Sequence, residues 1–255
     1  MSSEKVPQQR TKGVDSARRA LQILLQFSET TPELTVENVL EAHDVSVPSA
    51  YRYISLLREM NLIEERSKGS FVLSPQLIKL ARAAEVAFDH RGQVQPVLER
   101  LRDETGEAAL FVRRLNENAV CVAIAEADHA IKLSFQPGSL MPLHGGAAAK
   151  VLLAAYSKAK RSSYLDRLQP ALAAADRAGL EAELEQIQRT NLAQSAGEVD
   201  EGVWAAAAGV RVHGALMGAV TVAAPAYRLN DVSRAAVAGA VGRAAHELDM
   251  AIAGR

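Results

Sequence analysis

Apolar residues recur at helical spacing in three short segments near the N-terminus. Residues 16–29 and 36–43 each carry an apolar stripe along one face, which predicts two helices, and Thr35 is placed to cap the second. Residues 44–46 form a tight connection, and residues 48–60 show the helical period again. Helix, three-residue turn and helix in this order predict a helix-turn-helix.

The third helix presents a polar face opposite its apolar stripe. Its apolar positions follow the i, i+4, i+7 pattern: Ala50, Ile54 and Leu57. The opposite face is small at its start and then cationic and hydrogen-bonding, and it consists of Pro48, Ser49, Arg52 and Tyr53. If the first turns enter a DNA major groove, Ser49 and Arg52 contact bases or phosphates and Tyr53 contacts the DNA backbone. We expect Tyr51 to be partly packed.

Two strand-like runs, 62–66 and 70–74, flank a glycine-containing turn. A hairpin directly after a recognition helix is the wing of a winged helix-turn-helix. Basic residues beside the turn suit phosphate contacts, although the net charge of −1 is too weak to steer DNA from afar. The candidate DNA-binding residues are Ser46, Pro48, Ser49, Arg52, Tyr53, Arg66 and Lys68. A three-helix bundle with a hairpin and no DNA partner would show the same periodicity, so that alternative stays open.

The pattern changes after a polar stretch at residues 89–93. Apolar runs predict strands at 109–115, 119–127, 130–135, 203–212 and 216–225. Helical spacing predicts helices at 94–106, from about 146, at 157–168, 180–191 and 232–252. Strands at both ends with helices between them indicate an α+β domain around an antiparallel sheet. We therefore expect a winged helix-turn-helix domain at 1–74, with a flexible tail over 1–14, a linker helix at 75–91, and a second domain at 92–255.

Composition is consistent with two domains and excludes several classes of protein. The chain has 255 residues, of which 48% are hydrophobic, so it can form more than one core. No run reaches the roughly 18 to 20 consecutive apolar residues that a bilayer span requires. The polar N-terminus lacks the apolar segment of a signal peptide, and one cysteine excludes an intrachain disulfide. We expect a cytoplasmic protein without a membrane partner.

Residue types that support catalysis are scattered along the chain. The six histidines show no metal-ligand spacing, and Cys121 falls within a strand without an activating partner. The glycine-containing stretches 137–146 and 209–214 match no nucleotide-binding loop. The sequence therefore predicts no catalytic residue, no metal and no cofactor.

The loop that leads into the helix at about residue 146 has two interpretations. Free backbone N–H groups at a helix start bind anions, and the small residues Gly145, Gly146, Ala147 and Ala148 would let a carboxylate approach. Equally, small residues would let this helix lie closely against the sheet. Both interpretations stay open at this point.

Several segments, in this order, resemble the IclR family of bacterial transcription regulators. In the N-terminal third they are SARRALQILLQFS, PSAYRYISLLREMNLI and RSKGSFVLSPQLIKLA. In the remainder they are GSLMPLHGGAAAKVLLA, GEVDEGVWAAAAGV and a strand ending VTVAAP. The resemblance implies a winged helix-turn-helix joined by a helix to a GAF-like effector domain. It also implies dimers or tetramers that repress or activate operons in response to small metabolites, often organic or aromatic acids.

The family's effector pocket carries over to this sequence residue by residue. On that basis it consists of Leu133, Met141, Ala147, Ala148, Ser195, Val203, Ala205, Thr221 and Ala223. Strand alternation supports Val203 and Ala205 on one face and directs Trp204 to the other. Ser195 stands where the family frequently has an acidic residue, and residues 206–209 are smaller than the usual run. The resemblance thus implies a more apolar pocket with room for a bulkier effector, such as an aromatic acid.

We therefore expect a DNA-binding transcription regulator, a repressor rather than an activator, whose operator affinity is controlled by an organic or aromatic acid. Its partners are double-stranded operator DNA, the effector and further copies of the chain, in a dimer or dimer of dimers built through the N-terminal and linker helices. One alternative is a protein-interaction module whose winged helix contacts a partner protein. A less favoured one is an enzyme with a GAF-like catalytic domain, which would need a clustered acid/base or metal set.

Overall fold

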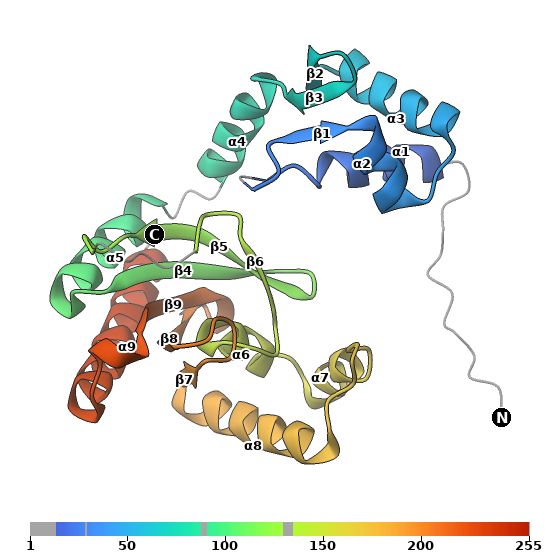
Figure 1. The fold of residues 1–255 in the computed structure, drawn as a ribbon. Coiled ribbons are helices and arrows are strands. Elements are labelled where there is room, and N and C mark those ends of the chain that lie inside the picture. The colour runs from blue at the N-terminus through green and yellow to red at the C-terminus, as the bar shows by residue number, and fades with distance from the viewer. Residues whose placement is uncertain (1–13, 29, 88–90, 130–134, 255) are drawn as a thin grey trace. The chain divides into compact units, whose positions relative to one another are not determined.

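A computed structural model describes residues 14–28, 30–87, 91–129 and 135–254 (Figure 1). The chain forms two compact units, Met1–Phe88 and Asp89–Arg255, each with its own hydrophobic core. Among the described residues, no helix combines the length and the hydropathy that crossing a membrane requires.

The first unit is a winged helix-turn-helix, as the sequence predicts. Its helices are α1 (Asp15–Leu24), α2 (Val36–His43), α3 (Val47–Glu59) and α4 (Gln76–Ala87). Its strands are β1 (Glu33–Thr35), β2 (Ile63–Ser67) and β3 (Ser70–Leu73), which form an antiparallel sheet in the order β1-β3-β2. Thr35 caps α2 as expected and forms a capping box with Asn38, because Thr35 Oγ1 accepts from the Asn38 N–H at 3.3 Å and Asn38 Oδ1 accepts from the Thr35 N–H at 2.9 Å.

Two details of this unit differ from the sequence prediction. Helix α1 ends at Leu24, about a turn before the predicted end, and Leu25 is 81% exposed. Strand β1 was not predicted, because three residues are too few to show a period. It pairs with the wing strand β3, so the wing is attached to the segment that precedes α2.

The second unit is an α+β domain built on a six-stranded antiparallel sheet, as expected. The strands are β4 (Ala108–Leu115), β5 (Asn118–Ala125), β6 (Leu140–Pro142), β7 (Leu192–Ala196), β8 (Val203–Val212) and β9 (Ala215–Pro225). They lie side by side in the order β6-β5-β4-β9-β8-β7. The helices are α5 (Arg91–Thr105), α6 (Ala147–Ala154), α7 (Lys158–Leu165), α8 (Ala174–Thr190) and α9 (Asp231–Ala253), and the 3₁₀ turn η1 (Ala226–Arg228) precedes α9.

Helices cover both faces of this sheet (Figure 1). Helices α5 and α9 pack on one face, around Trp204 and the even-numbered residues of β8. Helix α6 packs on the other face, with α7 and α8 outside it, around Leu110, Leu143 and Leu152. Trp204 therefore points away from Val203 and Ala205, as the alternation predicts.

The short strands of this sheet were missed at the sequence level. Strand β6 lies in what the sequence suggests is a loop, and β7 lies beyond the predicted end of the preceding helix. Both are edge strands of five residues or fewer, which carry little periodic signal. The predicted strand at 130–135 falls largely outside the described residues.

Two glycines of the second unit provide a matched test of its packing. A Cβ on Gly218 would lie 2.5 Å from Phe111 Cζ and 2.8 Å from the Val112 carbonyl oxygen, whereas a Cβ on Gly242 of α9 meets nothing within 4 Å. We expect Gly218→Ala to lower the free energy of unfolding by about 1–3 kcal/mol through overpacking. Gly242→Ala should leave it unchanged or raise it by up to about 1 kcal/mol.

Denaturant titrations followed by Trp204 fluorescence would measure both changes. Trp204 is the chain's one tryptophan and is buried in this unit, so its emission reports the unfolding of this unit. Equal midpoints for the two variants would contradict the close packing at Gly218.

Candidate functional site

The exposed face of α3 carries most of the predicted DNA-binding residues. Arg52 and Pro48 are exposed, and Ser49 is half-buried. Pro48 lies in the first turn of α3 and Ser46 is its N-cap residue, as expected. The Ser46 side chain does not cap the helix, and its hydroxyl instead donates to Ser49 Oγ at 3.0 Å. Arg52 forms no ion pair with any described residue, so its charge is available to a partner.

Tyr53 is the exception, and the sequence prediction for it is wrong. Its side chain is 5% exposed and packs in the core with Ile54 and Leu57. Tyr51, which we expected to be partly packed, is 52% exposed. The buried stripe is wider than three positions, because Tyr53 stands three residues after Ala50 and four before Leu57. Tyr51 therefore replaces Tyr53 on the outer face.

The wing brings two further cations to the surface. Lys68 is exposed at the turn, and Arg66 Nη1 lies 3.8 Å from Glu33 Oε2, in an exposed pair. The turn is closed by Gly69, with φ +77°, whose N–H donates to Glu65 Oε1 at 3.1 Å. The wing thus carries both charge signs, and Lys68 is its cation without an ion pair among the described residues.

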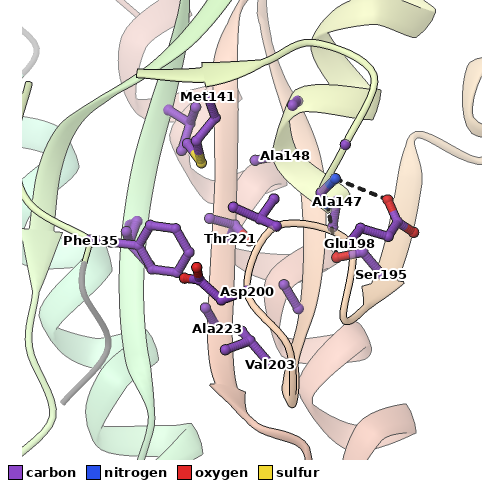
Figure 2. A pocket seen from close by; sticks show the side chains of 17 residues that line it. Phe135, Met141, Ala147, Ala148, Ser195, Glu198, Asp200, Val203, Thr221 and Ala223 are labelled. Carbon is purple, nitrogen blue, oxygen red and sulfur yellow. Dashed lines mark hydrogen bonds between the residues drawn. The ribbon is translucent and has the colours of Figure 1, made fainter. Parts of the chain in front are cut away.

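In the second unit, one pocket of about 480 Å³, counting its open mouth, lies between the sheet and the N-terminus of α6 (Figure 2). Eight of the nine predicted effector residues line it: Met141, Ala147, Ala148, Ser195, Val203, Ala205, Thr221 and Ala223. The ninth, Leu133, lies outside the described residues. The register explains the grouping, because Ser195, Ala205 and Ala223 are direct neighbours across β7, β8 and β9.

The pocket has an apolar body. Leu110, Val112, Phe135 and Met141 contribute large side chains, and the alanines of β8, β9 and α6 leave the space between them. Two hydroxyls face this space, those of Ser195 and Thr221. Thr221 Oγ1 donates to the Ala206 carbonyl at 2.8 Å, so it can only accept from a ligand.

Protein side chains already occupy part of the α6 N-terminus. Glu198 Oε2 accepts from the Gly146 N–H at 2.9 Å, and Ser195 Oγ accepts from the Ala147 N–H at 3.0 Å. No hydrogen bond among the described residues engages the next two amides, those of Ala148 and Ala149. The whole of α6 is also buried against the sheet. The small residues thus serve close packing, and the same helix start offers hydrogen-bond donors to the pocket.

A buried lysine lies behind this helix start. Lys150 is 1% exposed, and its Nζ lies 2.6 Å from Glu198 Oε1, 2.6 Å from Glu183 Oε1 and 3.2 Å from the Gln194 carbonyl oxygen. The ammonium is fully engaged by these three groups, so it is not a free cation for a ligand. Among the described residues, the charged side chains that line the pocket are Glu198 and Asp200, both acidic.

Sequence reasoning missed this acidic loop. Residues 197–202 connect β7 to β8 and place Glu198, Val199 and Asp200 at the pocket. Their signal in the sequence is the glycine at each end of GEVDEG, because Gly197 and Gly202 both have positive φ, of +67° and +77°. In the sequence this segment shows only the family resemblance, and none of its side chains is among the predicted pocket residues.

Reactive groups elsewhere in the described residues do not assemble into a catalytic or metal site. No cluster of three or more His, Cys, Asp or Glu side chains there is arranged to hold a metal ion. His144 Nδ1 lies 2.9 Å from the Tyr164 hydroxyl, and burial lowers the pKa of His144. Burial also raises the pKa of Cys121 to about 11, which leaves its thiol protonated.

Comparisons with known proteins agree with both units. The family model "Bacterial transcriptional regulator IclR C-terminal" matches residues 86–250, and the IclR helix-turn-helix model matches residues 16–67. The HTH-type transcriptional regulator BhcR of Paracoccus denitrificans is 27% identical over 251 residues, covering 95% of this chain and 89% of that protein. These matches are to transcriptional regulators and not to enzymes.

Solved structures share the fold over nearly the whole chain. A crystal structure described as an IclR transcriptional regulator from Silicibacter sp. TM1040 has a TM-score of 0.80 at 25% identity, covering 94% of this chain and 97% of the other. An IclR homolog from Microbacterium hydrocarbonoxydans, solved in complex with 4-hydroxybenzoate, has a TM-score of 0.79 at 16% identity, covering 94% of this chain and 100% of the other.

The burial of Cys121 behind the pocket predicts an unreactive thiol. With a pKa of about 11, only about one thiol in a thousand is thiolate at pH 8, and the fraction rises tenfold per pH unit up to the pKa. We expect iodoacetamide to leave the folded protein unlabelled at pH 8 and to label one site in concentrated guanidinium. Mass spectrometry would measure both, and labelling of the folded chain at the unfolded rate would contradict the burial.

Proposed function

Because this chain belongs to the IclR family of bacterial transcriptional regulators, we propose that it is a cytoplasmic repressor that an organic acid, most simply an aromatic one, releases from its operator. It is a transcriptional regulator with a DNA-binding helix-turn-helix and a C-terminal effector-binding domain. The observation that carries the proposal is the apolar pocket at the α6 N-terminus, in a chain whose α3 presents Arg52 without an ion pair to any described residue.

The choice of an aromatic acid rests on what the pocket offers. Phe135, Met141 and Leu110 suit a flat apolar body. The amides of Ala148 and Ala149 and the hydroxyl proton of Ser195 suit a carboxylate at one end of that body. The related fold that binds 4-hydroxybenzoate supports the same ligand class.

The proposed release from the operator rests on a dimer. We propose a homodimer, or a dimer of dimers, through α1 with its C-cap residue and through the linker helix α4, because both present apolar side chains that no described residue covers. The exposed ones are Leu21, Leu25, Ile78 and Leu80. A dimer contacts two half-sites spaced by whole DNA turns, and an effector that changes the placement of the two DNA-binding units lowers the fit to both.

The DNA interface is tested by removing the unpaired cation of α3. We expect Arg52→Ala to weaken binding to the protein's own upstream DNA by about 10- to 100-fold and to reduce the salt slope by about one. Fluorescence anisotropy at several salt concentrations would measure both. Arg243→Ala is the matched control, because it removes the same charge from an exposed Arg243–Glu104 pair in the other unit. An equal loss in the control would sink the assignment of Arg52, and salt-independent binding would favour a protein partner over DNA.

The effector assignment is tested by filling the pocket. Ala205→Leu adds bulk to a pocket-lining residue of β8, whereas Ala196→Leu adds the same bulk to an exposed position at the end of β7. In calorimetric titrations with 4-hydroxybenzoate, we expect Ala205→Leu to lower affinity by at least about tenfold and Ala196→Leu to change it by less than about twofold. Binding of two- or three-carbon acids alone would contradict the aromatic class.

A further inference from the structure

The loop between β7 and β8, residues 197–202, lies against the pocket as well as joining two strands. Its base is closed by two backbone hydrogen bonds, from Gly197 N–H to the Val203 carbonyl at 2.8 Å and from Val203 N–H to the Asp200 carbonyl at 3.1 Å. Val199 packs on the start of α6, because a Cβ placed on Gly146 would lie 2.9 Å from Val199 Cγ2. We call residues 197–202 the latch loop.

One side chain attaches the latch loop to the pocket wall. Glu198 accepts with one carboxylate oxygen from the Gly146 N–H at 2.9 Å (Figure 2). Its other carboxylate oxygen accepts from Lys150 Nζ at 2.6 Å. These are the bonds that a ligand carboxylate would make if it approached this corner of the pocket. Glu198 therefore places an internal carboxylate beside the helix start where the proposed effector would bind.

We propose that Glu198 is the specificity-determining residue of the pocket, an internal carboxylate that competes with acid effectors and that they must displace or tolerate at close range. This inference rests on the proposed function, because it concerns the same ligand site. A bound acid meets Glu198 and Asp200 with no free cation among the described pocket residues, so an acid of poor shape gains too little to enter. An acid that fills the apolar body offsets this electrostatic repulsion by burying its ring.

The buried network shows why Glu198 can leave without unfolding the site. When Glu198 moves, Lys150 keeps Glu183 Oε1 at 2.6 Å and the Gln194 carbonyl oxygen at 3.2 Å. The buried ammonium thus remains paired, which a lysine at 1% exposure requires. In this proposal Glu183 stays bound to Lys150 while Glu198 moves away, because Glu198 is the one of the two that lines the pocket.

The test compares a ligand with and without its charge. 4-Hydroxybenzoate and 4-hydroxybenzamide have nearly the same shape, so the ratio of their affinities isolates the effect of the carboxylate. We expect Glu198→Ala to raise the acid-to-amide affinity ratio by at least about tenfold, because it removes the competing anion. Glu198→Gln should raise it by a smaller factor, because its amide oxygen still accepts from the Gly146 N–H although the charge and the acceptor for Lys150 Nζ are lost.

Glu183→Ala is the matched control. It removes a carboxylate at the same 2.6 Å distance from Lys150 but leaves the Glu198–Gly146 bond in place. We expect it to change the ratio by less than about threefold. Calorimetry gives the affinities, and Trp204 fluorescence verifies that each variant is folded.

The outcomes separate two failures. If the wild type binds the acid and the ratio is the same in wild type, Glu198→Ala and Glu198→Gln, the acid-effector proposal stands and the role of Glu198 is overturned. An equal rise in Glu183→Ala also overturns it, because charge alone and not position would then set the ratio. If neither the wild type nor any variant binds either compound, the aromatic-acid proposal is wrong. The proposed competition with Glu198 then fails with it. If Glu198→Ala fails to fold, Glu198→Gln decides the question by itself, because it preserves the size of the side chain and an acceptor for the Gly146 N–H.

Discussion

The second unit depends on keeping one buried ammonium paired. Lys150 sits in the middle of α6 at 1% exposure, where an unpaired charge would cost several kcal/mol. Its three acceptors come from Glu183 of α8, the Gln194 carbonyl of β7 and Glu198 of the latch loop. Satisfying one cation therefore fixes a helix, an edge strand and a loop around α6. The pocket lies at the N-terminal end of that same helix, so the bonds of Lys150 also hold the wall of the pocket in place.

Small side chains create the space that this network encloses. In β8 the residues facing α6 are Val203, Ala205 and Ala207, whereas the alternate positions hold Trp204 and its neighbours against α5 and α9. One face of the strand is thus packed by a large aromatic ring, and the other is left shallow. Ser195 and Ala223 pair with Ala205 on the neighbouring strands and are also small. The cavity therefore follows from a line of small residues over three strands. A single larger side chain in this row would reduce the room for a ligand.

Long periodic segments of the sequence were enough to predict the two units, the helix-turn-helix, the wing and the long strands β8 and β9. The prediction failed where the signal was short or ambiguous. Strands β1, β6 and β7 have three to five residues and pair only at sheet edges or in small sheets. Tyr53 was placed outside because it does not belong to the apolar stripe of Ala50, Ile54 and Leu57, and its burial depends on how far the core extends around α3. Eight of the residues named from the resemblance line one cavity, but the resemblance did not reveal Glu198, whose proposed role depends on a bond between residues 52 positions apart.

An internal carboxylate at a ligand site has a thermodynamic consequence that contacts alone do not show. If an acid binds only when Glu198 is displaced, its apparent affinity is the intrinsic affinity multiplied by the fraction of molecules in which Glu198 is displaced. That reduction is the same for all acids, so Glu198 discriminates acids from neutral ligands of the same shape but does not by itself discriminate one acid from another. Selection among acids then depends on their concentrations. A weakly binding acid is present below its apparent dissociation constant and leaves the site empty, whereas an acid with a large buried ring still occupies it. The latch loop would thus lower the affinity for all acids, so that only a tightly binding acid occupies the site. This property suits a regulator that must not respond to the common small acids of a cell.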